Sequence, residues 1–315
     1  MKLVRHSFQL VIASALMSMM VLPLYGQQDR QPKASKKYPP TLPGAKVEVY
    51  KKIGEVQLRA YIYYPANHQP GDDRPAAVFY FGGGWRSGTP AQFMPHCKHL
   101  AARGMVAITV DYRVSSRHQT KAVNCVGDAK SAIRWVRKHH QRLGVDPRRI
   151  LAGGGSAGGH LAACTAVVEK YDETVEQSRI SSRPNALALF NPALVLAPIQ
   201  GVDPLDADRM AGLADRMGVS PVELSPIHHV RRGLPPTIIF HGQADTTVPF
   251  ETARQYATKA RGLGNQCKLV GYPGQPHGFF NESRGAKGRY QETLQELDRF
   301  LVSLGYLQAS RTANR

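Results

Sequence analysis

The sequence predicts an α/β fold with a mostly parallel central sheet and helices on both of its faces. Strand-like and helix-like segments alternate from Val47 to the end, and several strand-like runs are apolar at every position. Strands without a polar face are typical of parallel sheets covered on both sides. The chain has 315 residues, 42% of them hydrophobic, which suits one large domain of this class.

The elements follow in order along the chain. Val47–Tyr50 and Leu58–Tyr64 alternate apolar with polar residues, which indicates half-buried antiparallel strands. The later strands are expected at Ala76–Phe81, Met105–Val110, Arg149–Ala152, Ala186–Phe190, Thr237–Phe240 and Cys267–Tyr272. Helical spacing is found over Met94–Arg103, Ala122–Gln141, His160–Glu169, Glu251–Leu263 and Tyr290–Leu304.

The alternation of strand-like and helix-like segments is interrupted at about residues 198–236, where Ala207–Met217 is helix-like among prolines and glycines. We interpret this stretch as a small inserted lid over the site. The alternative is a long surface connection.

The first 26 residues have the order of a secretory signal peptide. Lys2 and Arg5 precede an almost wholly apolar run from Phe8 to Leu24, and a polar run begins at Gln27. We therefore expect a secreted or periplasmic protein; the alternative is an uncleaved membrane anchor. Residues 27–45 have the composition of a flexible linker, and the folded domain is expected over 46–308. No other stretch predicts stable membrane insertion.

The net charge of +18 predicts a basic surface. No basic stripe with stacking aromatic residues accompanies it, so nucleic acid is not an expected partner. The spacing of Cys97, Cys125, Cys164 and Cys267 lacks a CxxC or Cys/His metal pattern, so no metal is expected. Free thiols and a disulfide both remain open.

A glycine-rich turn predicts the nucleophile. Ser156 lies in a G-x-S-x-G pattern between the outer glycines Gly154 and Gly158, after a strand and before a helix. A serine on such a strained turn has an exposed hydroxyl at the positive end of the following helix. Glycines two residues before and after it remove side chains that would clash across the turn. A P-loop or dinucleotide-binding pattern is not matched.

An earlier glycine triplet predicts donors for a developing oxyanion. Gly82, Gly83 and Gly84 follow the strand that ends at Phe81. We expect the oxyanion hole to consist of the N–H groups of Gly83, Gly84 and Ala157, with Gly82 as an alternative.

An acid and a histidine should follow the nucleophile in that order. Asp245 comes after the strand Thr237–Phe240, and His277 follows the last strand. Both positions lie beyond carboxyl ends of strands, where parallel sheets place their sites. Weaker candidates are His160, His228, His229 and His241 among histidines and Asp111, Asp128, Asp203, Asp206 and Asp208 among acids.

Taken together, the motifs around Phe81–Trp85, Gly154–Leu161, His241–Asp245 and His277–Phe279 resemble those of the hormone-sensitive-lipase-like esterases of the α/β-hydrolase fold. The branch with carbohydrate acetyl esterases and feruloyl esterases is the most similar. The resemblance runs from Val47 to Leu304 and implies a Ser156–His277–Asp245 triad. Phe81 stands where this family has a histidine that helps to hold the loop, so the loop must be anchored by packing.

The sequence therefore predicts a secreted serine esterase for short-chain carboxylic esters, without metal or organic cofactor. The resemblance implies acetyl or feruloyl esters, on small molecules or on polysaccharides. One alternative is a prolyl-oligopeptidase-like exopeptidase, although the chain is too short for the propeller domain of that class. The other is a non-catalytic binding protein on a hydrolase scaffold. Oligomeric state is not predicted.

Overall fold

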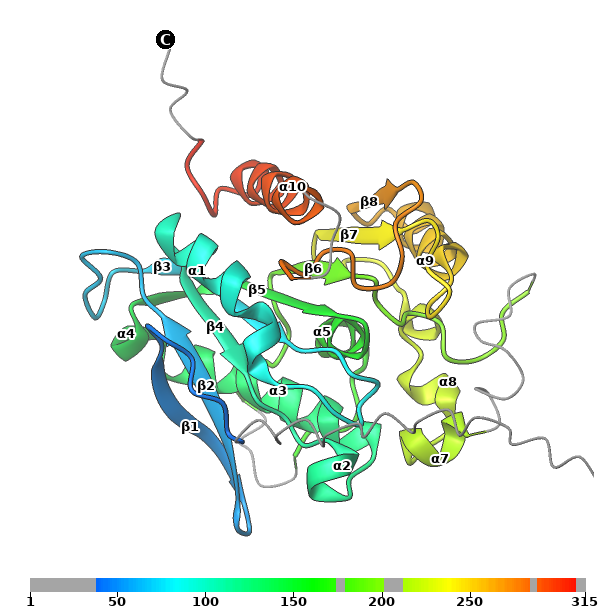
Figure 1. The fold of residues 1–315 in the computed structure, drawn as a ribbon, viewed down its shortest axis with the longest axis horizontal. Coiled ribbons are helices and arrows are strands. Elements are labelled where there is room, and N and C mark those ends of the chain that lie inside the picture. The colour runs from blue at the N-terminus through cyan, green and yellow to red at the C-terminus, as the bar shows by residue number, and fades with distance from the viewer. Residues whose placement is uncertain (1–37, 174–178, 201–211, 284–287, 310–315) are drawn as a thin grey trace, which may run out of the picture. The chain divides into compact units, whose positions relative to one another are not determined.

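The structure is a computed structural model that describes residues 38–173, 179–200, 212–283 and 288–309. The chain divides into a short unit, Met1–Tyr38, and a large unit, Pro39–Arg315. The predicted signal peptide lies outside the described residues, and so does most of the predicted linker. The large unit contains the described helices and strands (Figure 1).

An eight-stranded sheet forms the centre of the large unit, in the order β1-β2-β4-β3-β5-β6-β7-β8. The pairs β1–β2 and β2–β4 are antiparallel, and the other pairs are parallel. The strands are β1 Lys46–Ile53, β2 Val56–Tyr63, β3 Arg74–Tyr80, β4 Val106–Val110, β5 Val145–Gly155, β6 Ala186–Phe190, β7 Thr237–Gly242 and β8 Cys267–Tyr272. The predicted mostly parallel sheet, with antiparallel first strands, is confirmed.

Helices lie on both faces of this sheet (Figure 1). The longer ones are α1 Met94–Ala102, α3 Ala122–Lys138, α5 Ala157–Val167, α9 Phe250–Gly262 and α10 Arg289–Ser303. The short ones are η1 Pro90–Phe93, α2 Ser115–His118, α4 His140–Leu143, α7 Leu213–Met217, α8 Pro221–Leu224 and η2 Pro226–His229.

Alternate residues of the strands supply two separate apolar cores. In β3, Val78 belongs to the core on the face that α3, α5 and α9 cover, whereas Phe79 belongs to the core on the face that α1 and α10 cover. Both side chains are fully buried. Burial on both faces explains why the central strands are apolar at successive positions.

Several boundaries differ from the sequence prediction. The helix predicted over Ala122–Gln141 is two helices, because the backbone leaves helical geometry at His139 before α4 begins. Gly144 then adopts φ 60°, and its left-handed conformation redirects the chain into β5. That strand is longer than the predicted Arg149–Ala152. Leu42, inside the predicted linker, is buried in the core with α1 and α10, so the segment from residue 39 belongs to the fold.

The predicted lid segment contains α7, α8 and η2 in its described part. Residues 201–211, which include Asp203, Asp206 and Asp208 and most of the predicted helix Ala207–Met217, lie outside the described residues. That this segment is a lid over the site stays a prediction.

The four cysteines are buried free thiols. Among the residues that the structure covers, no helix has the length and apolarity to cross a membrane. The same residues contain no group of acidic, histidine and cysteine side chains suited to a metal ion.

His96 makes the stability of the folded domain depend on pH in the acid range. Its ring lies among Phe93, Phe190, Phe280 and Tyr290, with neither nitrogen hydrogen-bonded to a described residue. Burial lowers the pKa of His96 from 6.5 to about 3. The unfolded chain therefore binds the proton more tightly, and stability falls as the pH drops below 6.5 towards the folded pKa.

We expect His96→Phe to flatten this loss of stability. Between pH 6.5 and pH 5 the buried neutral ring costs the wild type about 1.6 kcal/mol of unfolding free energy, and the variant lacks this contribution. Urea unfolding at the two pH values measures the difference. An unchanged acid slope in a folded variant would show that His96 is not the group responsible.

Candidate active site

Ser156 occupies the turn between β5 and α5 with φ 55° and ψ −120°, a conformation that non-glycine residues rarely adopt. Its N–H donates to the carbonyl of Phe190 on β6 over 2.8 Å. A Cβ at Gly154 would collide with the carbonyl of Gly158, and a Cβ at Gly158 with that of Tyr80 on β3. The outer glycines thus permit the close approach that the sequence predicted for this turn.

Asp245 and His277 are brought together from the ends of neighbouring strands. Asp245 follows β7, and His277 follows β8. The carboxylate Oδ2 lies 2.7 Å from the imidazole Nδ1. The Asp245 side chain is completely buried, whereas that of His277 is 24% exposed. A buried carboxylate that holds one nitrogen of a partly exposed imidazole leaves the other nitrogen free to exchange a proton at the surface of the site.

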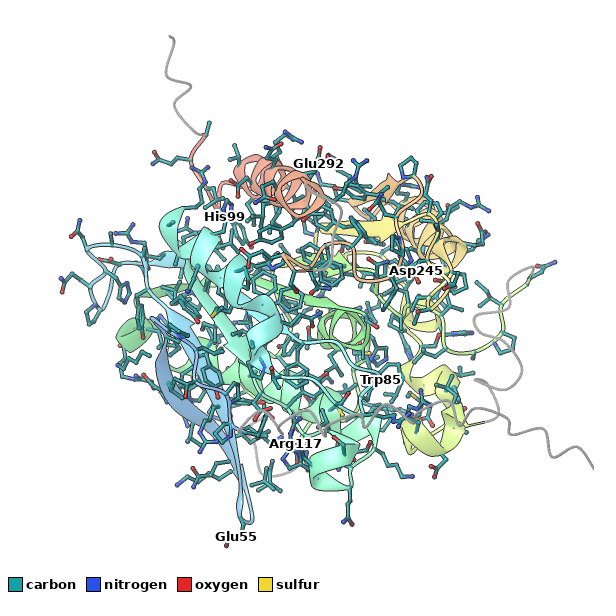
Figure 2. All side chains as sticks on the ribbon, in the orientation of Figure 1. Glu55, Trp85, His99, Arg117, Asp245 and Glu292 are labelled. Atoms are coloured by element: carbon teal, nitrogen blue, oxygen red, sulfur yellow. The ribbon has the colours of Figure 1, made fainter. Side chains whose placement is uncertain are left out.

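The buried carboxylate of Asp245 has a full set of further partners. Oδ1 accepts the backbone N–H groups of Thr247 at 2.8 Å and Val248 at 2.9 Å. Oδ2 accepts the side-chain amide of Asn191 at 2.5 Å, and the Nε2 of His241 lies 3.4 Å from it. Figure 2 labels Asp245 near the α9 side of the sheet.

These partners set the protonation state of Asp245. Burial alone would raise its pKa, but hydrogen bonds from His241 and His277, the charge of His277 and the N–H of Val248 outweigh it. The pKa of Asp245 is therefore held well below its ordinary value, and the group stays ionised at every physiological pH.

The loop that carries His277 packs against the Ser156 turn. The ring of Phe280, three residues after His277, would lie 2.5 Å from a Cβ at Gly155. Within the described residues, no hydrogen bond joins the Ser156 hydroxyl to the free Nε2 of His277. In unliganded hydrolases such contacts are often long and tighten when substrate binds.

The glycine loop after β3 lies directly beside Ser156, since a Cβ at Gly82 would come within 3.3 Å of the Ser156 Cβ. The N–H of Gly82 donates to Gln92 Oε1 at 2.6 Å, so this alternative oxyanion donor is occupied. Gly83 and Gly84 have φ values of 128° and 62°, and their N–H groups make no hydrogen bond to a described residue. Their two N–H groups are therefore free to bind a ligand.

Phe81 is anchored more firmly than packing alone would provide. Its ring stacks on Tyr112 with centroids 4.1 Å apart, and the Tyr112 hydroxyl donates to the Phe81 carbonyl at 2.7 Å. The aromatic pair holds the start of the glycine loop without a histidine at position 81.

Gln92 bridges the two loops of the site. Its Oε1 accepts the N–H of Gly82, and its Nε2 donates to Asn281 Oδ1 at 2.9 Å. Asn281 in turn donates to the carbonyl of Gly278, next to His277, at 2.8 Å. One amide side chain thereby connects the glycine loop to the histidine loop.

His160 is a second residue that connects the glycine loop to other parts of the fold. Trp85 donates its indole N–H to His160 Nδ1 at 3.2 Å, and His160 Nε2 lies 2.7 Å from the carbonyl of Leu224 in α8. Burial lowers the pKa of His160 to about 4, so the ring is neutral near pH 7. His160 therefore joins the glycine loop, α5 and α8 rather than acting as a base.

The remaining sequence candidates lie elsewhere or serve the fold. His228 and His229 line a separate cavity with Val167–Lys170 and Val230. Asp128 is buried in ion pairs with Lys51 and Arg113. Sequence reasoning did not find Gln92, Asn191 and Asn281, whose polar side chains meet these loops only in the folded chain.

The chain belongs to the α/β-hydrolase-fold family, because the family model described as alpha/beta hydrolase fold matches residues 77–281. The predicted fold family is thereby confirmed. Among proteins with curated names, the chain is similar to Esterase LipC of Mycobacterium tuberculosis (strain ATCC 25618 / H37Rv), with 31% identity over 220 residues that cover 67% of this chain and 54% of LipC. It is also similar to Carboxylesterase NlhH of the same strain, with 28% identity over 258 residues that cover 77% of this chain and 78% of NlhH.

Solved structures of Thermogutta terrifontis esterase 2 are more similar in sequence. The native structure has a TM-score of 0.83 and 54% identity, covering 88% of this chain and 98% of that one. The structure phosphoramylated by tabun has a TM-score of 0.81 and 54% identity, covering 87% of this chain and all of that one. The chain spans about half the length of the first curated relatives, namely 54%, 48% and 44% of them.

The Gln92 bridge leads to a stability prediction. Gln92→Leu removes both hydrogen bonds and leaves the Gly82 N–H and the Asn281 amide without their partner, which costs about 1–3 kcal/mol. We expect a lower unfolding free energy in urea. The same change at the exposed Gln57, which makes no side-chain hydrogen bond to a described residue, is the control. Equal stability of the two variants would mean that the bridge contributes nothing.

Proposed function

We propose that this chain is a secreted serine esterase that hydrolyses short-chain carboxylic esters through Ser156, His277 and Asp245. The observation that carries the proposal is the 2.7 Å contact between the buried Asp245 carboxylate and the His277 imidazole, on a loop that packs against the Ser156 turn. The similarity to proteins named esterase and carboxylesterase supports the reaction class.

In the proposed mechanism, His277 Nε2 removes the proton of the Ser156 hydroxyl as its oxygen attacks the ester carbonyl. Asp245 fixes the imidazole with Nδ1 protonated and stabilises the imidazolium that forms. The imidazolium then protonates the leaving alcohol. Water, deprotonated by His277, attacks the acyl-enzyme and releases the acid, which restores the Ser156 hydroxyl.

The oxyanion of each tetrahedral intermediate is proposed to bind the N–H groups of Gly83, Gly84 and Ala157. The free N–H groups of the two glycines support this assignment, and Ala157 begins α5, whose positive end faces the turn. Such donors each contribute about 2.7–4 kcal/mol to the transition state. None of these steps needs a metal ion or an organic cofactor.

Short acyl groups are the proposed substrates, since structures of Thermogutta terrifontis esterase 2 have propionate or butyrate bound. The amino-terminal sequence pattern supports export, and the family resemblance supports acetyl or feruloyl esters on polysaccharides as substrates. Rates on p-nitrophenyl esters of increasing chain length and on acetylated xylan would define the acyl and alcohol parts. Peptide anilides assayed in parallel would reveal peptidase activity.

Ser156→Ala should lower the hydrolysis of p-nitrophenyl acetate by at least about 1000-fold, because no nucleophile remains. A fluorophosphonate probe should label the wild type and not the variant. Ser303→Ala, at an exposed position in the last turn of α10, is the control for folding and rate. Retained turnover in folded Ser156→Ala would refute the assignment.

Asp245→Asn should lower kcat by about 10,000-fold, since a neutral amide neither holds the required imidazole tautomer nor stabilises the imidazolium. The matched control is Asp298→Asn, because Asp298 forms a second carboxylate–imidazole contact, to His99 at 2.9 Å. Single-turnover kinetics measure both variants. Comparable rates for the two would argue against a role for Asp245 in the reaction.

A further inference from the structure

A cavity of about 390 Å³ adjoins the glycine loop. Trp85 and Arg86 form part of its lining and directly follow Gly84. Figure 2 shows Trp85 between the α5 region and the part of the fold that contains α2 and α7. The remaining lining residues are Ser115, Gln119, Thr120, Lys121, Gly212, Asp215 and Arg216. A volume of this size suits part of a small organic substrate.

The charged groups of this cavity are predominantly positive. Lys121 pairs with Asp215 at 2.5 Å, so the charges of these two groups offset each other. The guanidinium groups of Arg86 and Arg216 form no ion pair or hydrogen bond with a described residue, and the cavity has no other acid in its lining. Among the described residues, two positive charges of this cavity therefore remain without a counter-charge.

Backbone hydrogen bonds hold the main chain of Arg86 in the glycine loop. The N–H of Arg86 donates to the carbonyl of Gly83 at 3.1 Å, and its own carbonyl accepts the N–H of Ser116 at 3.0 Å. Trp85 is held in turn by His160, one helical turn after Ser156. Arg86 is thus part of the same loop that supplies the proposed oxyanion donors, two residues after Gly84.

We propose that this cavity binds an anionic substituent, such as a carboxylate, on a part of the ester substrate away from the reacting carbonyl. The inference rests on the proposed function and narrows its substrate class to esters that carry a negative charge. Arg86 contributes a charge anchored to the glycine loop, and Arg216 contributes a second charge from α7. Guanidinium groups suit carboxylates because they offer paired N–H donors.

The test compares two substrates that differ in one charge. Meta- and para-acetoxybenzoate carry a carboxylate on the leaving phenol, and their methyl esters are neutral. The quantity measured is the ratio of kcat/KM for the acid to that for its methyl ester, at low ionic strength. Comparing this ratio between variants cancels the different reactivities of the two leaving groups.

We expect the Arg86→Gln/Arg216→Gln double variant to have a ratio about fivefold lower than the wild type, mainly through KM for the acid. Salt should lower the wild-type ratio towards that of the variant, since screening weakens such contacts. Arg86→Glu should lower the ratio further. The control is Arg232→Gln, at an exposed arginine outside the cavity, which should keep the wild-type ratio.

Two outcomes would count against the inference in different ways. If the double variant hydrolyses the neutral ester and keeps the wild-type ratio and salt dependence, the cavity does not bind the charge, and the esterase proposal stands. If the wild type hydrolyses neither p-nitrophenyl acetate nor any of these esters, the proposed function fails and the inference fails with it.

Discussion

The arrangement of the site depends on one buried negative charge, the carboxylate of Asp245. An ionised carboxylate inside a protein is costly unless its oxygens are hydrogen-bonded. Here two backbone N–H groups, the amide of Asn191 and the imidazole of His277 supply those bonds. Because these donors come from the ends of β6, β7 and β8, satisfying the charge requires the three strand ends to be in register. The same constraint that stabilises the carboxylate therefore orients His277.

The other constraint is steric and acts at the Ser156 turn. The carbonyl of Tyr80 on β3 occupies the space where any side chain at position 158 would lie, and the carbonyl of Gly158 does the same for position 154. β3, β5 and the start of α5 are thus brought into backbone contact. This contact places the glycine loop, which continues from β3, beside the Ser156 side chain. Gln92 and His160 then fix that loop laterally, to the histidine loop and to α8.

The sequence was informative where the chemistry is local. Neighbouring residues define the patterns that predicted the site, namely the glycines spaced around Ser156 and an acid and a histidine after apolar strands. The positions of the strands along the chain could be predicted because buried strands are apolar. It was uninformative where a contact joins distant positions. Gln92 and Asn281 are 189 positions apart, and Asn191 and Asp245 are 54 apart. A glutamine or asparagine carries no pattern that separates these partners from exposed amides. The end of α3 was missed for a related reason, since His139 and Gly144 break a helical pattern that the side-chain periodicity alone continues.

The positively charged side chains of the domain differ in whether they are paired with acids. Lys51 and Arg113 neutralise the buried Asp128 and also contact Glu173, so these cations belong to the folded structure and are not available to a ligand. The net charge of +18 is the excess of cations over acids, so it shows that cations without an acid partner exist but not where they lie. What distinguishes Arg86 is its position: it lies in the glycine loop, where its backbone N–H donates to Gly83, and its guanidinium has no partner among the described residues. A cationic residue next to the proposed oxyanion donors can select among bound substrates, whereas a cation elsewhere on the surface only raises the local concentration of anions.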